Sequence, residues 1–340
     1  MIQPRTRALL VQRRRPHGVR RAQDGVKPMP RYIRASRSAA LAVAAVASCR
    51  PRPEAGANAS VEPAAAVAGP SMEPVDSGYA DVHGLRMYYE VYGAGKPLVL
   101  LHGSYMNIPL NWAHIIPLLA KDRKVIAAEM QGHGRTRDIP REFSYEGMAD
   151  DVSGLLEHLK IERADVLGYS MGGGVAFQVA VRHPEKVRRL VVLSGVYAHD
   201  GWWPDVEASF ATFTPEMFKG TPIHEQYVGS GNDPGHFPEF VQKVIGIDLK
   251  PYDWSKDVKN IEAPIFMAIG DADGVRYEHA MELFRAKGGG KMGDIHGLPE
   301  SRLAVLPSTT HIGMIQRTDW LIPMIRDFLD SDLDSAPPTF

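Results

Sequence analysis

The sequence Gly-Tyr-Ser-Met-Gly-Gly at residues 168–173 places one serine between glycines, directly after an apolar run and directly before a stretch of helical spacing. The run at 164–168 has the composition of a short buried strand, and residues 173–183 have the period of a helix. A sharp turn from strand to helix strains the serine backbone, and side chains two positions away on either side would clash. The glycines therefore predict a turn that lifts the Ser170 hydroxyl out of a sheet. There the N–H of Met171, at a helix N-terminus, can bind a developing negative charge.

From about residue 79, pairs of an expected strand and an expected helix follow one another along the chain. Short apolar runs alternate with amphipathic stretches, which predicts an α/β fold with a mostly parallel central sheet and helices on both faces. In such a sheet the ligand site lies at the C-terminal ends of the strands, so the residues just after each strand are the candidates for function. Strands are expected at 85–92, 97–101, 124–130, 164–168, 190–194, 264–269 and 303–306, and helices at 112–120, 145–159, 173–183 and 320–329.

The composition excludes several classes of protein. With 340 residues, 44% of them hydrophobic, the chain can bury a large core and is not a disordered protein. The net charge of -1 is uneven: residues 1–52 hold 13 Lys and Arg and one acid, so the rest is acidic and argues against nucleic acid as a partner. Cys49 is the single cysteine, which excludes an internal disulfide framework and a cysteine zinc cluster.

The basic residues precede an apolar segment near the N-terminus. Arg31, Arg34 and Arg37 stand before about ten apolar residues, the layout of a secretory signal that is too short to span a bilayer. The run ends in Val-Ala-Ser-Cys at 46–49, which resembles the lipobox of bacterial lipoproteins, in which the cysteine is acylated. We therefore expect residues 1–49 to be an extension with a signal, and Cys49 to be a lipid anchor that holds an exported protein at the periplasmic face or the outer membrane.

Two alternatives stay open for this segment. A cleaved signal peptide, with Cys49 present by coincidence, would leave the protein secreted or periplasmic without an anchor. Met1 and Met29 are both candidates for the true start. Residues 50–77, rich in Ala, Pro and Gly and without a helical or strand period, are expected to be a flexible linker.

Chemically useful side chains follow several of the expected strands. Ser170 follows the fourth strand, a Gly-Asp-Ala-Asp-Gly segment at 270–274 follows the sixth, and His311 follows the last strand and precedes the last helix. Because parallel strands end at the same edge of a sheet, these groups are expected to meet there. A serine, a histidine and a carboxylate in contact form a nucleophile, its general base and the group that orients the base.

Residues 79–329 as a whole resemble the α/β-hydrolase fold family. Gly168-Tyr-Ser-Met-Gly172 matches the family's nucleophile elbow, and the family order of Ser, then Asp or Glu, then His is present. The resemblance implies a catalytic triad. The family's Gly-x-x-Asp spacing favours Asp273 as its acid, with Asp271 and Asp200 as alternatives.

Two further loops match the family. His102-Gly103 resembles its oxyanion turn, which implies that the N–H of Ser104 (or of Tyr105) is the second oxyanion donor beside that of Met171. Residues 131–134 resemble a loop that often reads Asp-x-x-Gly-His-Gly. This sequence has Glu129 where that aspartate usually stands, and no catalytic role is assigned to it.

About 70 residues separate two of the expected strands, far more than an ordinary connection. At this point, after the strand expected at 190–194, which corresponds to strand 6 of the family, the family carries a cap over the site. The resemblance therefore implies a core at 78–196 and 263–335 and a helical cap at 197–262. The cap is rich in aromatic residues, most of which are expected to pack it onto the core. The residues expected to contact substrate are Tyr105, Met130, Tyr169, Trp202 and Trp203.

The resemblance implies a serine hydrolase that cleaves a carboxylic ester or lactone of a small to medium apolar substrate through an acyl-enzyme, without a metal or organic cofactor. Other chemistry on the same triad stays open: a carbon–carbon bond hydrolase, an amidase or a haloperoxidase-like perhydrolase. A non-catalytic, membrane-tethered binding protein is the alternative from another class. Epoxide hydrolases and haloalkane dehalogenases of this family use an aspartate nucleophile, whereas this chain has Ser170.

Overall fold

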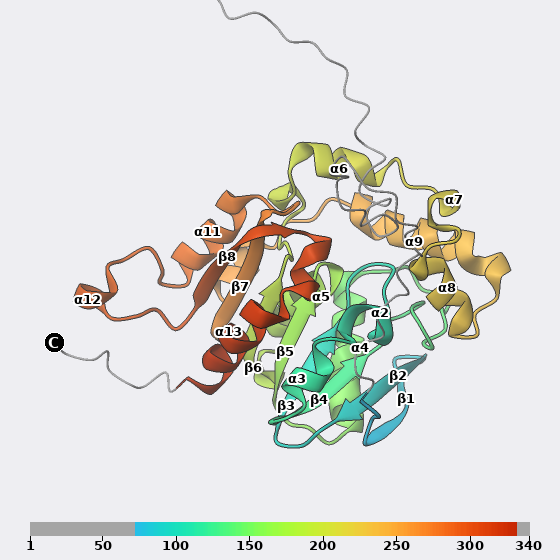
Figure 1. The fold of residues 1–340 in the computed structure, drawn as a ribbon, viewed down its shortest axis with the longest axis horizontal. Helices are drawn as coiled ribbons and strands as arrows, with labels where there is room; N and C mark the ends of the chain where they lie inside the picture. Colours follow the sequence, from blue (N-terminus) through green and yellow to red (C-terminus); the bar gives the residue numbers. More distant parts are fainter. Residues whose placement is uncertain (1–71, 332–340) are drawn as a thin grey trace, which may run out of the picture. The chain divides into compact units, whose positions relative to one another are not determined.

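The computed structural model describes residues 72–331. The predicted signal with Cys49, most of the predicted linker and the residues after 331 lie outside the described residues. Eight strands of the described part form one sheet (Figure 1). They are β1 (Asp76–Val82), β2 (Leu85–Tyr92), β3 (Lys96–Leu101), β4 (Arg123–Ala128), β5 (Ala164–Tyr169), β6 (Val187–Leu193), β7 (Ile265–Ala272) and β8 (Arg302–Thr310).

The strand order is β1-β2-β4-β3-β5-β6-β7-β8. The pairs β1–β2 and β2–β4 are antiparallel and the other five pairs are parallel, which confirms the predicted mostly parallel sheet. From β3 the chain continues to β4 on one side and then returns to β5 on the other side. The order therefore reverses between β3 and β5, the kind of point at which open α/β sheets bind their ligands.

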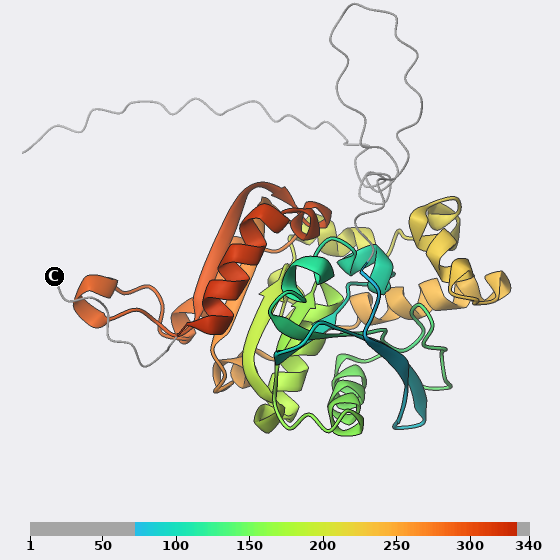
Figure 2. The same ribbon diagram turned by 60° about the horizontal axis from the view of Figure 1, so that its bottom comes forward.

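Helices cover both faces of the sheet, because successive strand residues point to opposite sides. In β3, Val99 and Leu101 belong to one buried cluster and Leu98 and Leu100 to the other. Helices α4 (Tyr145–His158), α5 (Met171–Arg182) and α11 (Tyr277–Ala286) pack on the first cluster; α2 (Ile108–Trp112), α3 (Ile116–Leu119) and α13 (Thr318–Asp330) pack on the second. Figure 2 shows α4 and α13 on opposite sides of the sheet.

Two sequence predictions were wrong in detail. The edge strand β1 was not predicted, and it begins at Asp76, inside the segment expected to be linker. The single helix expected at 112–120 is two short helices, α2 and α3, separated by a turn. The reason is Pro117, which takes a first-turn position of α3 because its ring and missing N–H are tolerated only there.

The predicted helical insertion between β6 and β7 is confirmed. It comprises α6 (Pro204–Phe210), α7 (Pro215–Phe218), α8 (Pro222–Gly229), α9 (Phe237–Leu249) and α10 (Ser255–Lys259), and α6–α9 are grouped at the top of the view in Figure 1. Phe218, Phe237 and Phe240 of this cap are buried in the same cluster as residues of α4 and α5, so the cap packs on the sheet domain. A one-turn helix α12 (Gly293–His296) precedes β8. In the described part of the chain, every helix is too short or too polar to cross a bilayer.

Candidate active site

Ser170 lies in the turn between β5 and α5, with φ 53° and ψ -118°. This left-handed φ is rare for a residue with a side chain and marks a strained position. The flanking glycines make the turn possible: a Cβ on Gly168 would lie 2.0 Å from the carbonyl oxygen of Gly172, and one on Gly172 would lie 2.1 Å from that of Leu101. The structure thus confirms the steric argument made from the sequence.

His311 follows β8 and reaches Ser170 across the ends of the intervening strands. Its Nε2 lies 2.9 Å from Ser170 Oγ, and its Nδ1 lies 2.8 Å from Asp273 Oδ1. A carboxylate only accepts hydrogen bonds, so Nδ1 carries a proton and, in the neutral ring, Nε2 is free to accept the serine proton. The hydroxyl of Tyr169 donates to the backbone carbonyl of His311 at 2.9 Å and holds this loop against β5.

Asp273, which follows β7, is buried and receives several hydrogen bonds. The hydroxyl of Ser194 and the N–H of Gly270 donate to Oδ2, and the N–H of Val275 donates to Oδ1. Burial alone would raise the pKa of Asp273, but His311 and these donors outweigh burial and lower it. The carboxyl is therefore ionised at neutral pH and can stabilise a protonated His311.

The two alternative acids do not reach His311. Asp271 is exposed at the end of β7, and its carboxylate accepts from the backbone N–H of Thr309 at 3.0 Å. Asp200 is also exposed, and its backbone carbonyl accepts from Arg276. The geometry thus brings together Ser170, His311 and Asp273.

The expected oxyanion donors lie next to Ser170. A Cβ on Gly103 would lie 3.4 Å from Ser170 Cβ, which places the turn after β3 against the serine. The N–H of Gly103 donates to Asn111 Oδ1 at 2.8 Å and anchors this turn on α2. Within residues 72–331 the N–H groups of Met171 and Ser104 donate to no protein acceptor, so both remain available to a ligand.

Two buried histidines support the same turn. His102 donates from Nδ1 to the carbonyl of Gly103 and accepts at Nε2 from the N–H of Met130, and burial lowers its pKa, so the ring is neutral. His133 packs against it with ring centroids 4.8 Å apart. Both ring nitrogens of His102 are occupied by backbone groups, and Nδ1 of His133 contacts the carbonyl of Gln131, which gives the two rings a positioning role.

Glu129 is fully buried and does not contact the triad. It pairs with Arg135, whose Nη2 and Nε lie 2.8 and 3.1 Å from its oxygens. A Cβ on Gly134 would lie 2.3 Å from Glu129 Cδ, so the glycine makes room for this ion pair. Glu129, which is longer than the aspartate usual at this position, therefore stabilises the loop after β4 through its ion pair with Arg135.

Comparisons with known proteins agree with this architecture. A family model described as the alpha/beta hydrolase fold matches residues 96–247. The crystal structure of the enol-lactonase from Burkholderia xenovorans LB400 superposes with a TM-score of 0.58 at 22% identity, and covers 74% of this chain and 100% of that one. The chain has the α/β-hydrolase fold.

Curated relatives align over a shorter segment. The 2-hydroxymuconate semialdehyde hydrolase of Pseudomonas sp. strain CF600 is 42% identical over 113 residues, 32% of this chain and 40% of that protein. The soluble epoxide hydrolase of Corynebacterium sp. strain C12 is 39% identical over 114 residues, 34% of this chain and 40% of that protein. The chain thus aligns with about 40% of the length of these relatives.

The residues expected to contact substrate occupy different places in this fold. Trp202 packs edge-on against His311 with centroids 5.5 Å apart, and Tyr105 lies under the cap rings of Phe218 and Phe240. Trp203 packs instead on Tyr277, with ring centroids 5.7 Å apart.

Two of the expected contact residues belong to the packed interior. Tyr169 is only 1% exposed, and its hydroxyl donates a hydrogen bond to the backbone carbonyl of His311. Its side chain therefore supports the loop that carries His311 and does not line a substrate site. Met130 is equally buried, in the cluster that also contains Met171.

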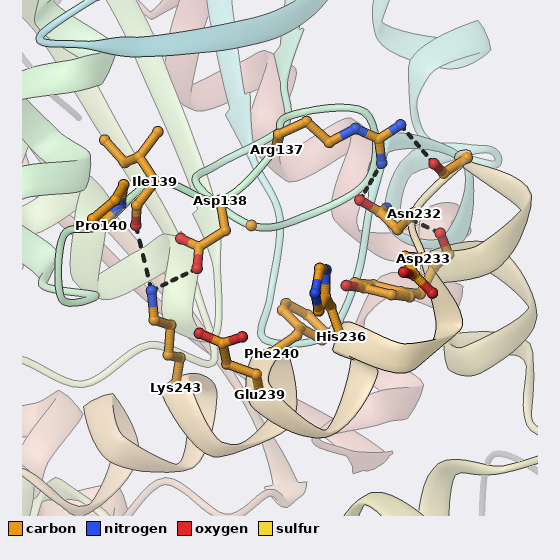
Figure 3. A pocket seen from close by; sticks show the side chains of 13 residues that line it. Arg137, Asp138, Ile139, Pro140, Asn232, Asp233, His236, Glu239, Phe240 and Lys243 are labelled. Atoms are coloured by element: carbon orange, nitrogen blue, oxygen red, sulfur yellow. Dashed lines mark hydrogen bonds and ion pairs between the residues drawn. The ribbon is translucent and has the colours of Figure 1, made fainter.

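A cleft of about 550 Å³ opens between the loop after β4 and cap helices α8 and α9 (Figure 3). Charged groups line it but are largely paired. Arg137 donates to Asn232 and to the carbonyl of Gly231, and Lys243 donates to Asp138 at 2.5 Å. The triad does not line this cleft. Phe240 separates it from the interior, since its ring also packs on Tyr105 and His133.

Sequence reasoning missed three residues near the site. Ser194, directly after β6, donates to Asp273, which lies 79 positions further along the chain. Asn111, on α2, accepts a hydrogen bond from the N–H of Gly103, eight positions earlier. Asp248 is an acidic residue on the otherwise apolar stripe of α9. This break in the apolar pattern is visible in the sequence. Within residues 72–331 no three His, Cys, Asp or Glu side chains are arranged to hold a metal ion.

Proposed function

We propose that this protein is a serine hydrolase that cleaves a carboxylic ester or lactone of a small to medium apolar substrate through an acyl-enzyme. The observation that carries the proposal is the unbroken hydrogen-bond chain from Ser170 through His311 to Asp273, with links of 2.9 and 2.8 Å. A serine hydroxyl is a weak nucleophile unless an oriented base takes its proton, and this arrangement supplies the base and its orienting carboxylate.

In the acylation step, Ser170 Oγ attacks the carbonyl carbon as His311 Nε2 takes the hydroxyl proton. The carbonyl electrons move onto oxygen, and the N–H groups of Met171 and Ser104 donate hydrogen bonds to this oxyanion. Asp273 keeps the Nδ1 proton in place and stabilises the positive imidazolium. The bond to the leaving alkoxide then breaks, His311 returns the proton to it, and Ser170 is left as an ester.

Deacylation repeats the same steps with water. His311 takes a proton from a water molecule, whose oxygen attacks the acyl carbon and forms a second oxyanion at the same two amides. Collapse of this intermediate breaks the bond to Ser170 Oγ, which regains the proton from His311. The carboxylic acid leaves, and the enzyme returns to its starting state without any change of oxidation state.

Apolar substrates suit the surroundings of Ser170. Trp202 approaches His311 from the cap side, and Tyr105 beside the oxyanion turn is covered by Phe218 and Phe240. Aromatic walls with a few polar groups are the usual lining of sites for small organic ligands.

Carbon–carbon bond hydrolysis is the second candidate, and the relative from Pseudomonas sp. strain CF600 favours it. The compound in that protein's name, 2-hydroxymuconate semialdehyde, contains no ester, so a hydrolase that acts on it must cut a carbon–carbon bond. The same serine, histidine and oxyanion donors serve this reaction after the substrate has been protonated to its keto form.

The named activity of the Corynebacterium relative fits this chain less well. Attack of Ser170 on an epoxide would leave an alkyl ether on the serine, and water has no acyl carbon to attack in an ether. A carboxylate nucleophile would leave an ester that water can release. Because Ser170 stands at this turn, we do not extend epoxide hydrolysis to this protein.

Short-chain nitrophenyl esters test the proposal. We expect hydrolysis by wild type, a loss of about 10⁴-fold or more in kcat for Ser170→Ala, and fluorophosphonate labelling of Ser170 that His311→Ala abolishes. Turnover of 2-hydroxymuconate semialdehyde in parallel compares the two candidates. Faster turnover of the semialdehyde than of every ester would replace the ester function by the carbon–carbon one. Absence of both turnover and labelling would favour a non-catalytic binding protein.

A further inference from the structure

Tyr105 has a backbone conformation that is rare for a residue with a side chain. It is the third residue of a tight turn after β3, in which the N–H of Met106 donates to the carbonyl of Gly103 at 3.2 Å. Its φ is 63°, a left-handed value that glycine or asparagine usually supplies at this position of a turn. Ser170 and Ser194 at the triad share this conformation, with φ 53° and 51°. Strain of this kind is kept at functional sites, so a tyrosine at a position that favours glycine indicates a use for its side chain.

The hydroxyl of Tyr105 supplies a second, independent sign of a ligand. It is buried and has no hydrogen-bond partner within residues 72–331. Burial raises the pKa of this hydroxyl, so it stays protonated at neutral pH and can donate a hydrogen bond. Native proteins leave few buried polar groups without a partner, because each one is unfavourable to folding. An acceptor from a ligand would satisfy this hydroxyl.

The ring of Tyr105 lies between the oxyanion turn and the cap. Its centroid is 4.7 Å from that of Phe218 on α7 and 6.2 Å from that of Phe240 on α9. Phe240 packs in turn on His133, with centroids 4.9 Å apart. These contacts restrict the phenol, so the hydroxyl is preorganised before a ligand binds.

A continuous series of ring contacts joins Tyr105 to the catalytic base through the cap. Neighbouring centroids in the series are at most 6.3 Å apart, and its members in order are Tyr105, Phe218, Phe213, Phe210, Trp202 and His311. We call the first five rings the aromatic arc. Three of them, Phe213, Phe210 and Trp202, stay partly accessible and can contact a ligand.

The two ends of the aromatic arc meet Ser170 from different sides. At one end His311 Nε2 lies 2.9 Å from Ser170 Oγ. At the other end Tyr105 is two residues from Gly103, on which a Cβ would lie 3.4 Å from Ser170 Cβ. The arc therefore spans the reacting serine from its base to its oxyanion turn, and it is the surface against which an acyl chain on Ser170 would lie.

We propose that Tyr105 is a specificity residue: its hydroxyl donates a hydrogen bond to an ether or keto oxygen on the acyl chain of the substrate, which lies against the aromatic arc. This inference rests on the proposed hydrolase function. The arc carries one hydroxyl among its five rings, so it suits a chain that is apolar except at one position. A hydrocarbon chain leaves the Tyr105 hydroxyl unpaired, whereas a chain with one acceptor oxygen satisfies it. The site therefore favours alkoxy- or oxo-acyl esters over hydrocarbon acyl esters of the same length.

Two matched pairs of nitrophenyl esters test the selection, with an oxygen in place of one CH₂ in each pair: methoxyacetate against butanoate, and 3-methoxypropanoate against pentanoate. Tyr105→Phe removes the hydroxyl and keeps the ring contacts. We expect it to lower the ether-to-hydrocarbon ratio of kcat/KM about tenfold in at least one pair, and to change kcat/KM for the hydrocarbon esters less than about twofold. Tyr227→Phe is the control, because Tyr227 packs on the same Phe240 ring at 5.1 Å, and it should leave both ratios within about twofold.

Two kinetic results would overturn the inference. The first is a ratio that Tyr105→Phe leaves unchanged in both pairs. The second is an equal loss of kcat/KM on ether and hydrocarbon esters, which would assign the hydroxyl to the reacting carbonyl oxygen instead. A structural role is tested by melting: Tyr105→Phe should melt at or above the wild-type temperature, because the hydroxyl it removes has no partner in the protein. A fall of about 5 °C or more would show a structural hydrogen bond and would also overturn the inference.

Calorimetric binding separates this inference from the proposed function. The 3-methoxypropanoate and pentanoate esters are titrated into Ser170→Ala and into the double variant that also carries Tyr105→Phe. The ether ester should bind more tightly to Ser170→Ala, and the second change should remove most of this preference, even if wild type hydrolyses neither ester. Equal affinities of the two esters for Ser170→Ala would overturn the selection whatever the outcome for hydrolysis.

Discussion

The triad and the cap are built in different ways. Ser170, Asp273 and His311 each follow a strand of one sheet, and backbone groups hold them: Gly270 and Val275 donate to the aspartate, and the histidine loop is tied to β5. The cap meets the sheet domain mainly through aromatic packing. A few exposed polar contacts join it to the loop after β4. The triad side chains are therefore held by the sheet and by hydrogen bonds, while the cap is held mainly by side-chain packing.

This difference predicts that changes in the triad region abolish catalysis or folding, whereas changes in the cap alter selectivity and stability by smaller amounts. It also explains why an ionisable group is tolerated on α9. A cap that is packed less completely can leave Asp248 partly accessible, while Asp273 is enclosed and satisfied by donors.

The largest effect is expected from the triad acid. Asp273→Asn should lower kcat/KM on a nitrophenyl ester by about 10³–10⁴-fold, because an amide can donate to Nδ1 and hold His311 in the tautomer that cannot accept the serine proton. Asp271→Asn, the matched change two residues away, should cost less than about threefold. Similar losses in the two variants, both with wild-type melting temperatures, would contradict the assignment of Asp273.

Glycine substitutions compare the two regions at the level of the backbone. Gly168→Ala places a Cβ 2.0 Å from a backbone oxygen and should destabilise the fold by more than about 4 kcal/mol or prevent soluble expression. Gly246→Ala on cap helix α9 meets no atom within 4 Å and should stabilise the protein by about 0.5–1 kcal/mol. Urea unfolding measures both. A soluble Gly168→Ala variant of wild-type stability would be incompatible with the turn described for Ser170.

The pH dependence of stability tests the environment of Asp248. Burial raises its pKa from 3.8 to about 7, so the folded state holds the proton more tightly than the unfolded state. Its contribution is present in full below pH 3.8 and is lost as the pH rises to about 7. Asp248→Asn should therefore melt close to wild type at pH 4 and about 3 °C or more above it at pH 8. The phenols of Tyr105, Tyr145 and Tyr252 stay neutral across this range, because burial raises the pKa of each. Glu239→Gln, a change at an exposed carboxylate of the same helix, should show no such divergence. A constant difference from pH 4 to 8 would argue against the buried carboxyl.

The smallest effect is expected at the polar contact between the loop after β4 and the cap, which Figure 3 shows. Arg137 is exposed, and its bonds to Asn232 and Gly231 join the loop after β4 to the cap. Arg137→Ala should lower the free energy of unfolding by less than about 1 kcal/mol and raise KM about twofold with kcat unchanged, since exposed polar contacts contribute little. A large fall in kcat would show that this contact positions the reacting groups and does not only hold the cap in place.

Much of the fold was predictable because its signals are local. The alternation of apolar runs and amphipathic stretches follows from the periods of strand and helix, and it located seven of the eight described strands. The edge strand β1 lacks a strong apolar run, since only Ala80 and Val82 of its residues are buried, and it was assigned to the linker. The split of α2 from α3 depended on a proline inside an otherwise helical pattern.

The sequence by itself determined the turn at Ser170, because the contact that excludes a side chain at Gly168 is made with Gly172, four residues away. It also determined the order of serine, acid and histidine. Only the tertiary structure decided between Asp271 and Asp273, since the pairing of β7 with β8 sets which carboxylate faces His311 and which faces solvent. It also decided that Tyr169 supports the histidine loop and that Asp248 faces the interior. Contacts of this kind join residues about 40 to more than 140 positions apart, and no local pattern encodes them.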